Sequence, residues 1–144
     1  MVTDRFATAI LVVILSHLYP EYRHICMLLI VLDITSHWIR VVASLLVGEG
    51  HKTIKNTYKL LQIYYSNRIV LGLVCLGNEL FYISAYMYFY FPTISVLDFS
   101  INLFGLTVLV CAPVFFFKQM LNLMQLQYSA VEIVDWEFQH EHKK

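Results

Sequence analysis

Apolar residues are concentrated in four long runs that alternate with short polar segments. The runs predict helices at about residues 5–19, 25–47, 69–91 and 94–123. The last three runs reach the roughly 20 residues that an α-helix needs to cross a bilayer, whereas the first run is shorter. The pattern therefore predicts an all-α, polytopic membrane protein with about four transmembrane helices, forming a single membrane domain over residues 1–144.

Lysine and arginine residues gather at one set of predicted helix ends. If the N-terminus is placed in the cytosol, only Arg23 lies on the opposite side of the membrane. The other nine are Arg5, Arg40, Lys52, Lys55, Lys59, Arg68, Lys118, Lys143 and Lys144. Because cytosolic segments carry an excess of lysine and arginine, both termini, a loop at 48–68 and a tail at 124–144 are predicted to be cytosolic.

The composition agrees with a membrane protein. Hydrophobic residues make up 59% and charged residues 14% of the 144 residues, against about 45–50% and about 25% in soluble domains. The net charge of zero gives no indication of a nucleic-acid partner. The cysteines, Cys26, Cys75 and Cys111, lie in apolar runs and are odd in number, so they are predicted to be small core residues.

One face of the second predicted helix is polar. Ionisable groups inside a membrane span cost at least a few kcal/mol each, so they suggest a function. At 100° per residue, Asp33, Ser36, His37, Arg40 and Ser44 fall on one stripe toward the cytosolic half. Two interpretations remain open. The stripe is either a structural seam of ion pairs and hydrogen bonds between helices, or one wall of a polar cavity open to the cytosol.

The third predicted helix also groups its unusual residues on one face, which carries Gly72, Cys75, Glu79, Tyr82 and Tyr86. Small residues on such a face predict close contact with another helix. Glu79 requires either a cation from a neighbouring helix or a proton, and both a structural and a catalytic role remain open.

The predicted cytosolic loop is basic, with His51, Lys52, Lys55, Lys59 and Arg68. These charges favour contact with anionic lipid headgroups, or alternatively a phosphate-binding rim at the membrane surface. No P-loop, zinc motif, G-x-S-x-G string or catalytic-triad spacing occurs in the sequence.

Five strings, in this order and spacing, resemble the eukaryotic phosphatidylinositol synthases. They are M-V-T-D-R-F-A-T at 1–8, L-D-I-T-S-H-W at 32–38, H-K at 51–52, I-Y-Y-S-N-R at 63–68 and G-N-E-L-F-Y at 77–82. That family belongs to the CDP-alcohol phosphatidyltransferases, which share a six-helix fold. The resemblance implies that the four helices of this chain correspond to the third to sixth helices of that fold.

The resemblance also implies an activity, in which myo-inositol is joined to CDP-diacylglycerol with release of CMP at the endoplasmic reticulum membrane. Mg²⁺ or Mn²⁺ would be held by the aspartates of a D-x-x-D-G-x-x-A-R…G-x-x-x-D-x-x-x-D signature. Asp4 matches the last aspartate, the implied metal ligand and base that deprotonates the alcohol. The expected substrate-binding residues are Asp33, Ser36, His37, Arg40, His51, Lys52 and Arg68.

The sequence departs from this signature, of which only Asp4 is present. One carboxylate cannot hold two hard cations that each prefer about six oxygen ligands, so the chain alone is predicted to be inactive. Met1 is then expected to be an internal methionine of a longer protein. The alternatives are a catalytically inactive truncated family member and an unrelated four-helix membrane scaffold. A homo-oligomer is left open.

Overall fold

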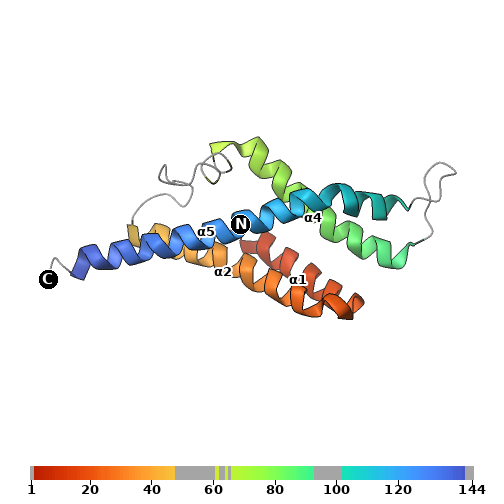
Figure 1. Ribbon diagram of the computed structural model, residues 1–144, viewed down its shortest axis with the longest axis horizontal. Helices are drawn as coiled ribbons and strands as arrows, with labels where there is room; N and C mark the ends of the chain where they lie inside the picture. Colours follow the sequence, from red (N-terminus) through yellow and green to blue (C-terminus); the bar gives the residue numbers. More distant parts are fainter. Residues whose placement is uncertain (1, 48–60, 62–63, 65, 93–101, 142–144) are drawn as a thin grey trace.

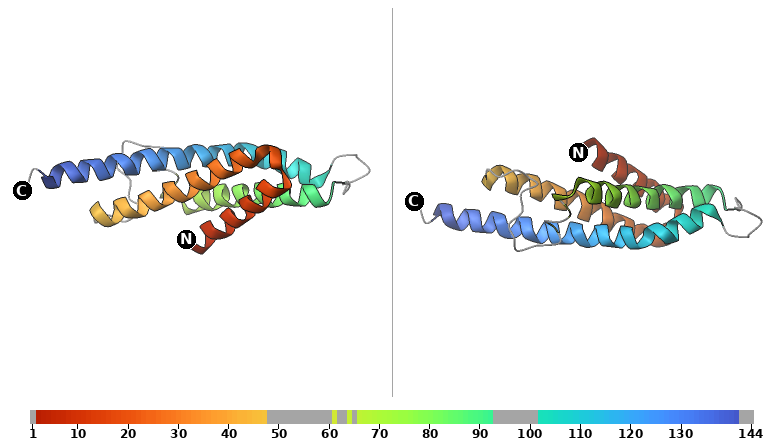
Figure 2. Two further views of the ribbon diagram at one scale, coloured as in Figure 1. Left: turned by 90° about the horizontal axis from the view of Figure 1, so that it is seen from below. Right: turned by 90° about the horizontal axis from the view of Figure 1, so that it is seen from above.

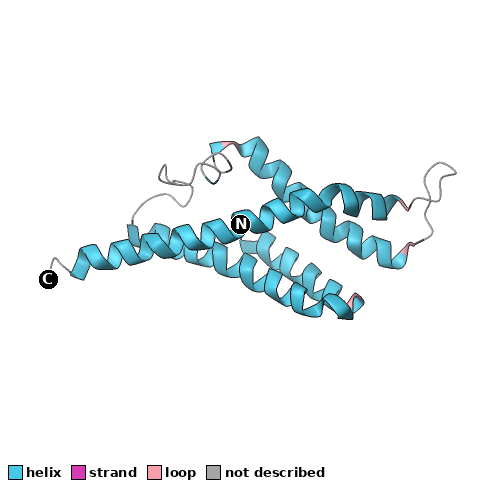
Figure 3. Ribbon diagram, viewed as in Figure 1, coloured by secondary structure: helices cyan, strands magenta, loops and turns pink. Residues whose placement is uncertain are grey.

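Four α-helices and one short 3₁₀ turn make up the part of the chain that the computed structural model describes, residues 2–47, 61, 64, 66–92 and 102–141 (Figures 1 and 3). The elements are α1 (Val2–Leu18), η1 (Pro20–Tyr22), α2 (Arg23–Val47), α4 (Arg68–Tyr90) and α5 (Leu103–Glu141). The prediction of an all-α chain is therefore confirmed.

The helices have the length and surface of membrane-spanning segments. Three of them, at Pro20–Val47, Arg68–Tyr90 and Leu103–His140, are long and apolar enough to cross a membrane, and Arg5–Leu18 is a shorter apolar helix. Many large apolar side chains lie on the outside of the bundle, among them Leu28, Leu45 and Leu109. A surface this apolar requires lipid rather than water as its solvent, so the chain is a multi-pass membrane protein.

The chain reverses direction at each connection, and α5 is the central helix. It packs against α2 along one side and α4 along another, while α1 packs against α2 and α4 (Figure 2). The turn between α1 and α2 begins with Pro20, whose fixed φ suits the first position of a helix. The preceding Tyr19 hydroxyl donates to the Ala85 carbonyl of α4 at 2.9 Å. Burial, followed by the Tyr88 hydroxyl, raises the pKa of Tyr19 above its ordinary value.

Asn102 connects the end of α4 to the start of α5. Its side-chain nitrogen donates to the carbonyls of Phe91 and Pro92 at 2.9 and 2.6 Å. Its side-chain oxygen accepts from the backbone N–H groups of Phe104 and Gly105, which have no partner within the helix. Asn67 caps α4 in the same way through Ile69 and Val70.

Two groups of buried side chains hold the helices together. Toward the α1–α2 turn, Val12 and Leu15 pack with Tyr82 and with Phe115, which stacks on Phe81. Toward the other end, a second group consists of Val74 of α4, Leu121 and Tyr128 of α5, and Leu61 and Tyr64, which precede α4. The polar residues described below lie alongside the second group, and on α5 they alternate with Leu121 and Tyr128.

The close approach of α4 and α5 occurs at Gly77. A Cβ atom added to Gly77 would lie 2.7 Å from Cγ1 of Val114, so only glycine fits without a shift of the neighbour. The sequence pattern pointed instead to Gly72, but in the described part of the chain nothing lies within 4 Å of a Cβ built there. That expectation was wrong, because helical periodicity selects a face and not the point at which a neighbour crosses it.

The predicted end of the last helix was also wrong. A helix was expected at 94–123 with a tail after it, but α5 continues to Glu141, while residues 94–101 lie outside the described residues. Apolar character falls after Leu123, whereas the backbone hydrogen bonding of the helix continues. At 39 residues, α5 is about 58 Å long, which exceeds a hydrocarbon core of about 30 Å. The helix therefore extends beyond the bilayer or tilts strongly within it.

Candidate functional site

A band of polar side chains, here called the polar seam, runs between α2 and α5. The α2 side supplies the stripe predicted from the sequence. The residues of the seam are Asp33, Ser36, His37 and Arg40 of α2 and Lys118, Asn122, Gln125, Ser129 and Glu132 of α5. The α5 residues follow one another at intervals of four and three, which places them on one face of that helix. Ser44, at the end of the predicted stripe, instead donates to the Val41 carbonyl of its own helix.

Asp33 is the residue of the seam that joins three helices. Arg5 of α1 donates to both carboxylate oxygens of Asp33, at 3.2 and 3.3 Å. Asn122 of α5 donates to Oδ1 at 3.0 Å, and the Nε2 atom of His37 lies 3.7 Å from the same oxygen. Inside an apolar bundle a carboxylate needs such partners, so Asp33 fixes α1 and α5 on α2.

Gln125 of α5 binds the middle of the stripe. Its amide nitrogen donates to the backbone carbonyl of Ser36 at 3.0 Å and lies 3.4 Å from Nδ1 of His37. The Ser36 hydroxyl donates to the Asp33 carbonyl one turn earlier. Ser36 is fully buried, whereas His37 keeps 17% of its side chain exposed. His37 is thus held at its edge while part of its ring stays accessible.

Arg40 lies at the closed end of the seam. It forms an ion pair with Glu132, and the two side chains are only 4% and 6% exposed. The ring of Tyr128 lies 5.2 Å from the guanidinium carbon, and the Tyr128 hydroxyl donates to the other oxygen of Glu132 at 3.2 Å. These partners enclose the ion pair, so this end of the seam matches the structural interpretation of the stripe.

Lys118 lies inside the bundle. The topology prediction counted it among charges at the cytosolic helix ends, but its residue surface is only 2% exposed. Its ammonium group donates to Oδ1 of Asn122 at 2.9 Å and lies 5.6 Å from the centre of the Tyr64 ring. Lys118 therefore lies within a continuous helix and not at a helix end, and its predicted position toward the cytosol stays a prediction.

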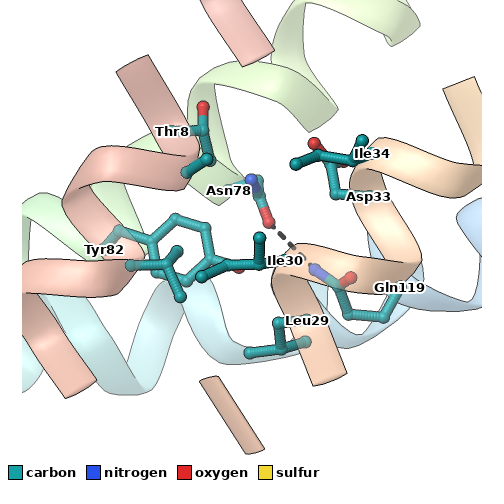
Figure 4. Close-up of a pocket in the computed structure, with 10 residues that line it drawn as sticks. Thr8, Leu29, Ile30, Asp33, Ile34, Asn78, Tyr82 and Gln119 are labelled. Carbon is teal, nitrogen blue, oxygen red and sulfur yellow. Dashed lines mark hydrogen bonds between the residues drawn. The ribbon is translucent and has the colours of Figure 1, made fainter. Parts of the chain in front are cut away.

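A small pocket adjoins the Asp33 end of the seam and is lined by residues from all four helices (Figure 4). Its polar lining includes Asp33, Asn78, Tyr82 and Gln119. Gln119 and Asn78 point toward each other, and the amide nitrogen of Gln119 donates to Oδ1 of Asn78 at 3.3 Å (Figure 4). The cavity volume is about 10 Å³, which is room for about one water molecule.

The structure does not bring all predicted site residues to the seam. Arg68 is exposed in the first turn of α4, away from the α2 stripe. Asp4 lies in the first turn of α1, but its side chain is outside the described part of the structure, as are His51 and Lys52 entirely. Glu79 is partly buried on α4.

The described cysteines and carboxylates do not gather into a metal site. All three cysteines are free thiols, and Cys75 lies 3.6 Å from the Tyr64 hydroxyl. Among the side chains that the structure describes, no group of three or more His, Cys, Asp or Glu residues could hold a metal ion. These residues therefore do not fit a site for two divalent cations, which would need several carboxylate oxygens close together.

The α5 half of the seam and the pocket residues Asn78 and Gln119 were missed by the sequence analysis. The signal was present, because polar positions at 118, 122, 125, 129 and 132 repeat with the period of one helix face. Because the helix was predicted to end at residue 123, positions 118 and 122 were assigned to the helix and positions 125, 129 and 132 to the tail, and the repeat was not recognised. Asn78 and Gln119 each lie beside a charged residue, Glu79 and Lys118, in otherwise apolar runs, and no pattern in the sequence pairs them.

Comparison with known proteins gives a consistent set of relatives, although no family model and no solved structure matches. The chain is 39% identical to the CDP-diacylglycerol–inositol 3-phosphatidyltransferase of Candida albicans over 100% of its length, which is 60% of that protein. It is 36% identical to the human enzyme of the same name, with 90% of the chain and 61% of that protein covered.

A plant relative is covered more fully. The probable CDP-diacylglycerol–inositol 3-phosphatidyltransferase 2 of Arabidopsis thaliana is 32% identical, with 100% of the chain and 67% of that protein matched. The chain thus spans about three fifths to two thirds of the length of these curated relatives. The matches run through all four helices, so this chain belongs to the CDP-diacylglycerol–inositol 3-phosphatidyltransferase family.

Proposed function

We propose that this chain forms the inositol-accepting part of an enzyme that transfers a phosphatidyl group from CDP-diacylglycerol to myo-inositol and releases CMP. The proposal rests on the names of the relatives, which match the chain from end to end. A multi-pass bundle with a polar seam in its interior is consistent with one lipid substrate and one water-soluble substrate meeting in the membrane.

The two interpretations of the α2 stripe apply to different parts of it in this proposal. Arg40 is enclosed by Glu132 and Tyr128 and serves the fold. Asp33 and His37 are each 17% exposed. Asp33 is also paired with Arg5, the residue that follows Asp4. Inositol is a neutral polyol, so its recognition depends on directed hydrogen bonds from groups such as these.

Asp4 is the proposed base that accepts the proton of the attacking inositol hydroxyl. Asp4 directly precedes Arg5, whose side chain is bonded to the Asp33 carboxylate, and this proximity in the chain supports the proposal. A carboxylate near the reacting hydroxyl can accept its proton as the bond to phosphorus forms. The proposed role of the basic residues His51, Lys52 and Arg68 is to bind lipid phosphates at the membrane surface.

Mg²⁺ or Mn²⁺ belongs to the proposal as the cofactor of the family. The described residues of this chain do not fit such a site, and Asp4 is the one signature aspartate in the sequence. The other metal ligands therefore have to come from residues other than those that the structure describes. The proposed setting is the endoplasmic reticulum membrane, with both helix-bundle termini in the cytosol, in keeping with the positions of lysine and arginine.

The test compares the activity of the chain with and without the missing signature segment. A chimera joins the signature-bearing segment of a full-length family member to Met1, and it is compared with the 144-residue chain in vesicles containing CDP-diacylglycerol, myo-inositol and Mg²⁺ or Mn²⁺. The chimera should form phosphatidylinositol and CMP, and the chain alone should not. Asp4→Asn in the chimera should lower turnover by about 10²–10⁴-fold.

Two outcomes would contradict the proposal. A folded chimera that binds CDP-diacylglycerol but forms no phosphatidylinositol would refute the activity. Turnover by the 144-residue chain at the rate of the chimera would refute the argument that one signature carboxylate is too few for catalysis.

A further inference from the structure

Gln119, which lines the pocket between the four helices, has one side-chain atom without a hydrogen-bond partner among the described residues. The side-chain oxygen of Gln119 is buried and has no hydrogen-bond partner among the described residues. The nitrogen of the same amide is already used by Asn78. A buried carbonyl without a partner destabilises an apolar bundle, so a hydrogen-bond donor is expected to occupy the pocket.

The dimensions of the pocket restrict what that donor can be. Room for about one oxygen atom with its hydrogens excludes a whole sugar or polyol ring. A water molecule or a single hydroxyl group fits. The remaining polar lining, Asp33 and Tyr82, lets such a hydroxyl make a second or third hydrogen bond, while Leu29 and Ile30 form apolar walls.

The pocket lies close to the proposed reacting group. Thr8 lines it and follows Asp4 by one helical turn of α1. Asp33 belongs both to the pocket and to the ion pair with Arg5. A ring that placed one hydroxyl in the pocket would therefore lie near the first turns of α1.

We propose that this pocket is a hydroxyl-recognition subsite, in which the Gln119 side-chain oxygen, held by Asn78, accepts a hydrogen bond from one hydroxyl of a cyclic polyol. This inference rests on the proposed function, which supplies myo-inositol as the polyol. The subsite admits one hydroxyl and orients the ring, so that a different hydroxyl meets the base. It assigns a specificity-determining role to Gln119 and Asn78, two residues outside the α2 stripe.

The test measures binding of myo-inositol to the 144-residue chain in lipid nanodiscs with CDP-diacylglycerol present, by saturation-transfer NMR. Gln119→Leu should weaken the affinity roughly three- to tenfold, the effect of losing one hydrogen bond. The matched control is Gln127→Leu on the same helix, where the glutamine is exposed. It should leave the affinity unchanged.

A second measurement needs no substitution in the pocket. In a series of deoxyinositols, each lacking one hydroxyl, one analogue should bind the unmodified chain more weakly than the others. That analogue alone should be insensitive to Gln119→Leu, because the hydrogen bond is already absent. Thermal unfolding of each variant checks that the bundle is intact.

The outcomes distinguish this inference from the proposed function. If Gln119→Leu and Gln127→Leu bind myo-inositol equally well, or if no analogue shows the insensitivity, the pocket holds only a structural water and the subsite is refuted. The proposed function is judged separately, by formation of phosphatidylinositol in the chimera. Absence of any myo-inositol binding by the unmodified chain also refutes the subsite.

Discussion

At the scale of single residues, the polar seam combines an enclosed ion pair with a more accessible group. Arg40 and Glu132 are almost completely buried, and removing one partner leaves the other charge without compensation. Asp33, Arg5 and His37 retain 14–17% exposure of their side chains. Substitutions in the two regions should therefore differ in kind, with stability affected at Arg40 and substrate affinity at His37.

Arg40→Met should destabilise the bundle by about 3–5 kcal/mol, because it leaves the Glu132 carboxylate buried with Tyr128 as its remaining described partner. The double variant Arg40→Met/Glu132→Leu should recover most of this loss. Unfolding by SDS in detergent micelles measures both. Arg23→Met is the matched control, since Arg23 is an exposed arginine at the start of the same helix. Equal stability of Arg40→Met and Arg23→Met would contradict the structural role.

His37→Ala in the active chimera should raise the KM for myo-inositol more than the KM for CDP-diacylglycerol, because the His37 side chain next to Asp33 is partly exposed. His24→Ala, at the exposed start of α2, should change neither constant. Steady-state kinetics with each substrate varied in turn provides the comparison. If His37 only supports the fold, its loss should lower thermal stability and harm both substrates alike. An unchanged KM for myo-inositol in a stable His37→Ala variant would refute the assignment of His37 to inositol binding.

At the scale of elements, α5 organises the bundle because it carries both the polar face toward α2 and the tight contact with α4. Val114 packs against the bare backbone of Gly77, and Lys118 and Asn122 follow within two turns. Small residues that allow helices to approach closely are the main source of packing energy in membranes. The position of Gly77 thus fixes the register in which α5 presents its polar residues.

Gly77→Ala should destabilise the protein by about 1–3 kcal/mol through overpacking against Val114, despite the better helix propensity of alanine. Adding Val114→Ala should relieve the clash and restore much of the stability. Gly72→Ala, on the same helix but exposed, is the control and should be neutral or slightly stabilising. Thermal unfolding in detergent distinguishes these results. The packing argument fails if both glycine substitutions have the same effect.

At the scale of the whole molecule, the alternating direction of the helices agrees with both termini lying on one side. The turn at Pro20–Tyr22 and the end of α4 lie at one end of the bundle, away from the N-terminus of α1 and the C-terminus of α5 (Figure 2). Removing the buried Arg40 and Lys118 from the count leaves seven lysine and arginine residues on the predicted cytosolic side against Arg23. This bias still favours the predicted orientation, which stays a prediction.

The orientation is tested by cysteine labelling in sealed microsomes, after replacement of the three native cysteines. Lys55→Cys should react with a membrane-impermeant maleimide added outside, because the predicted loop at 48–68 is cytosolic. Arg23→Cys, at the opposite ends of the helices, should react only after the membrane is permeabilised. The reverse pattern would contradict the predicted topology.

The number of helices, their membrane character, the polar stripe of α2 and the family could all be inferred from the sequence. Each depends on properties that are local to the chain, namely the length of an apolar run, the 100° step of a helix and the order of short strings. Asp33, Ser36, His37 and Arg40 share a face whatever lies opposite them. These inferences needed no knowledge of how the helices pack.

What faces that stripe was decided by the tertiary structure. A helical period selects the face of Asp33 and Arg40 but not their partners on α5, which lie 89 to 92 residues further along the chain. Hydropathy shows where a chain leaves lipid and not where its helix ends. The last helix was therefore predicted to stop at residue 123, and the polar residues of α5 beyond that position were not assigned to the seam. The contact at Gly77, the inward position of Lys118 and the pairing of Asn78 with Gln119 depend on how neighbouring helices cross, because packing energy is shared between segments that are distant in sequence.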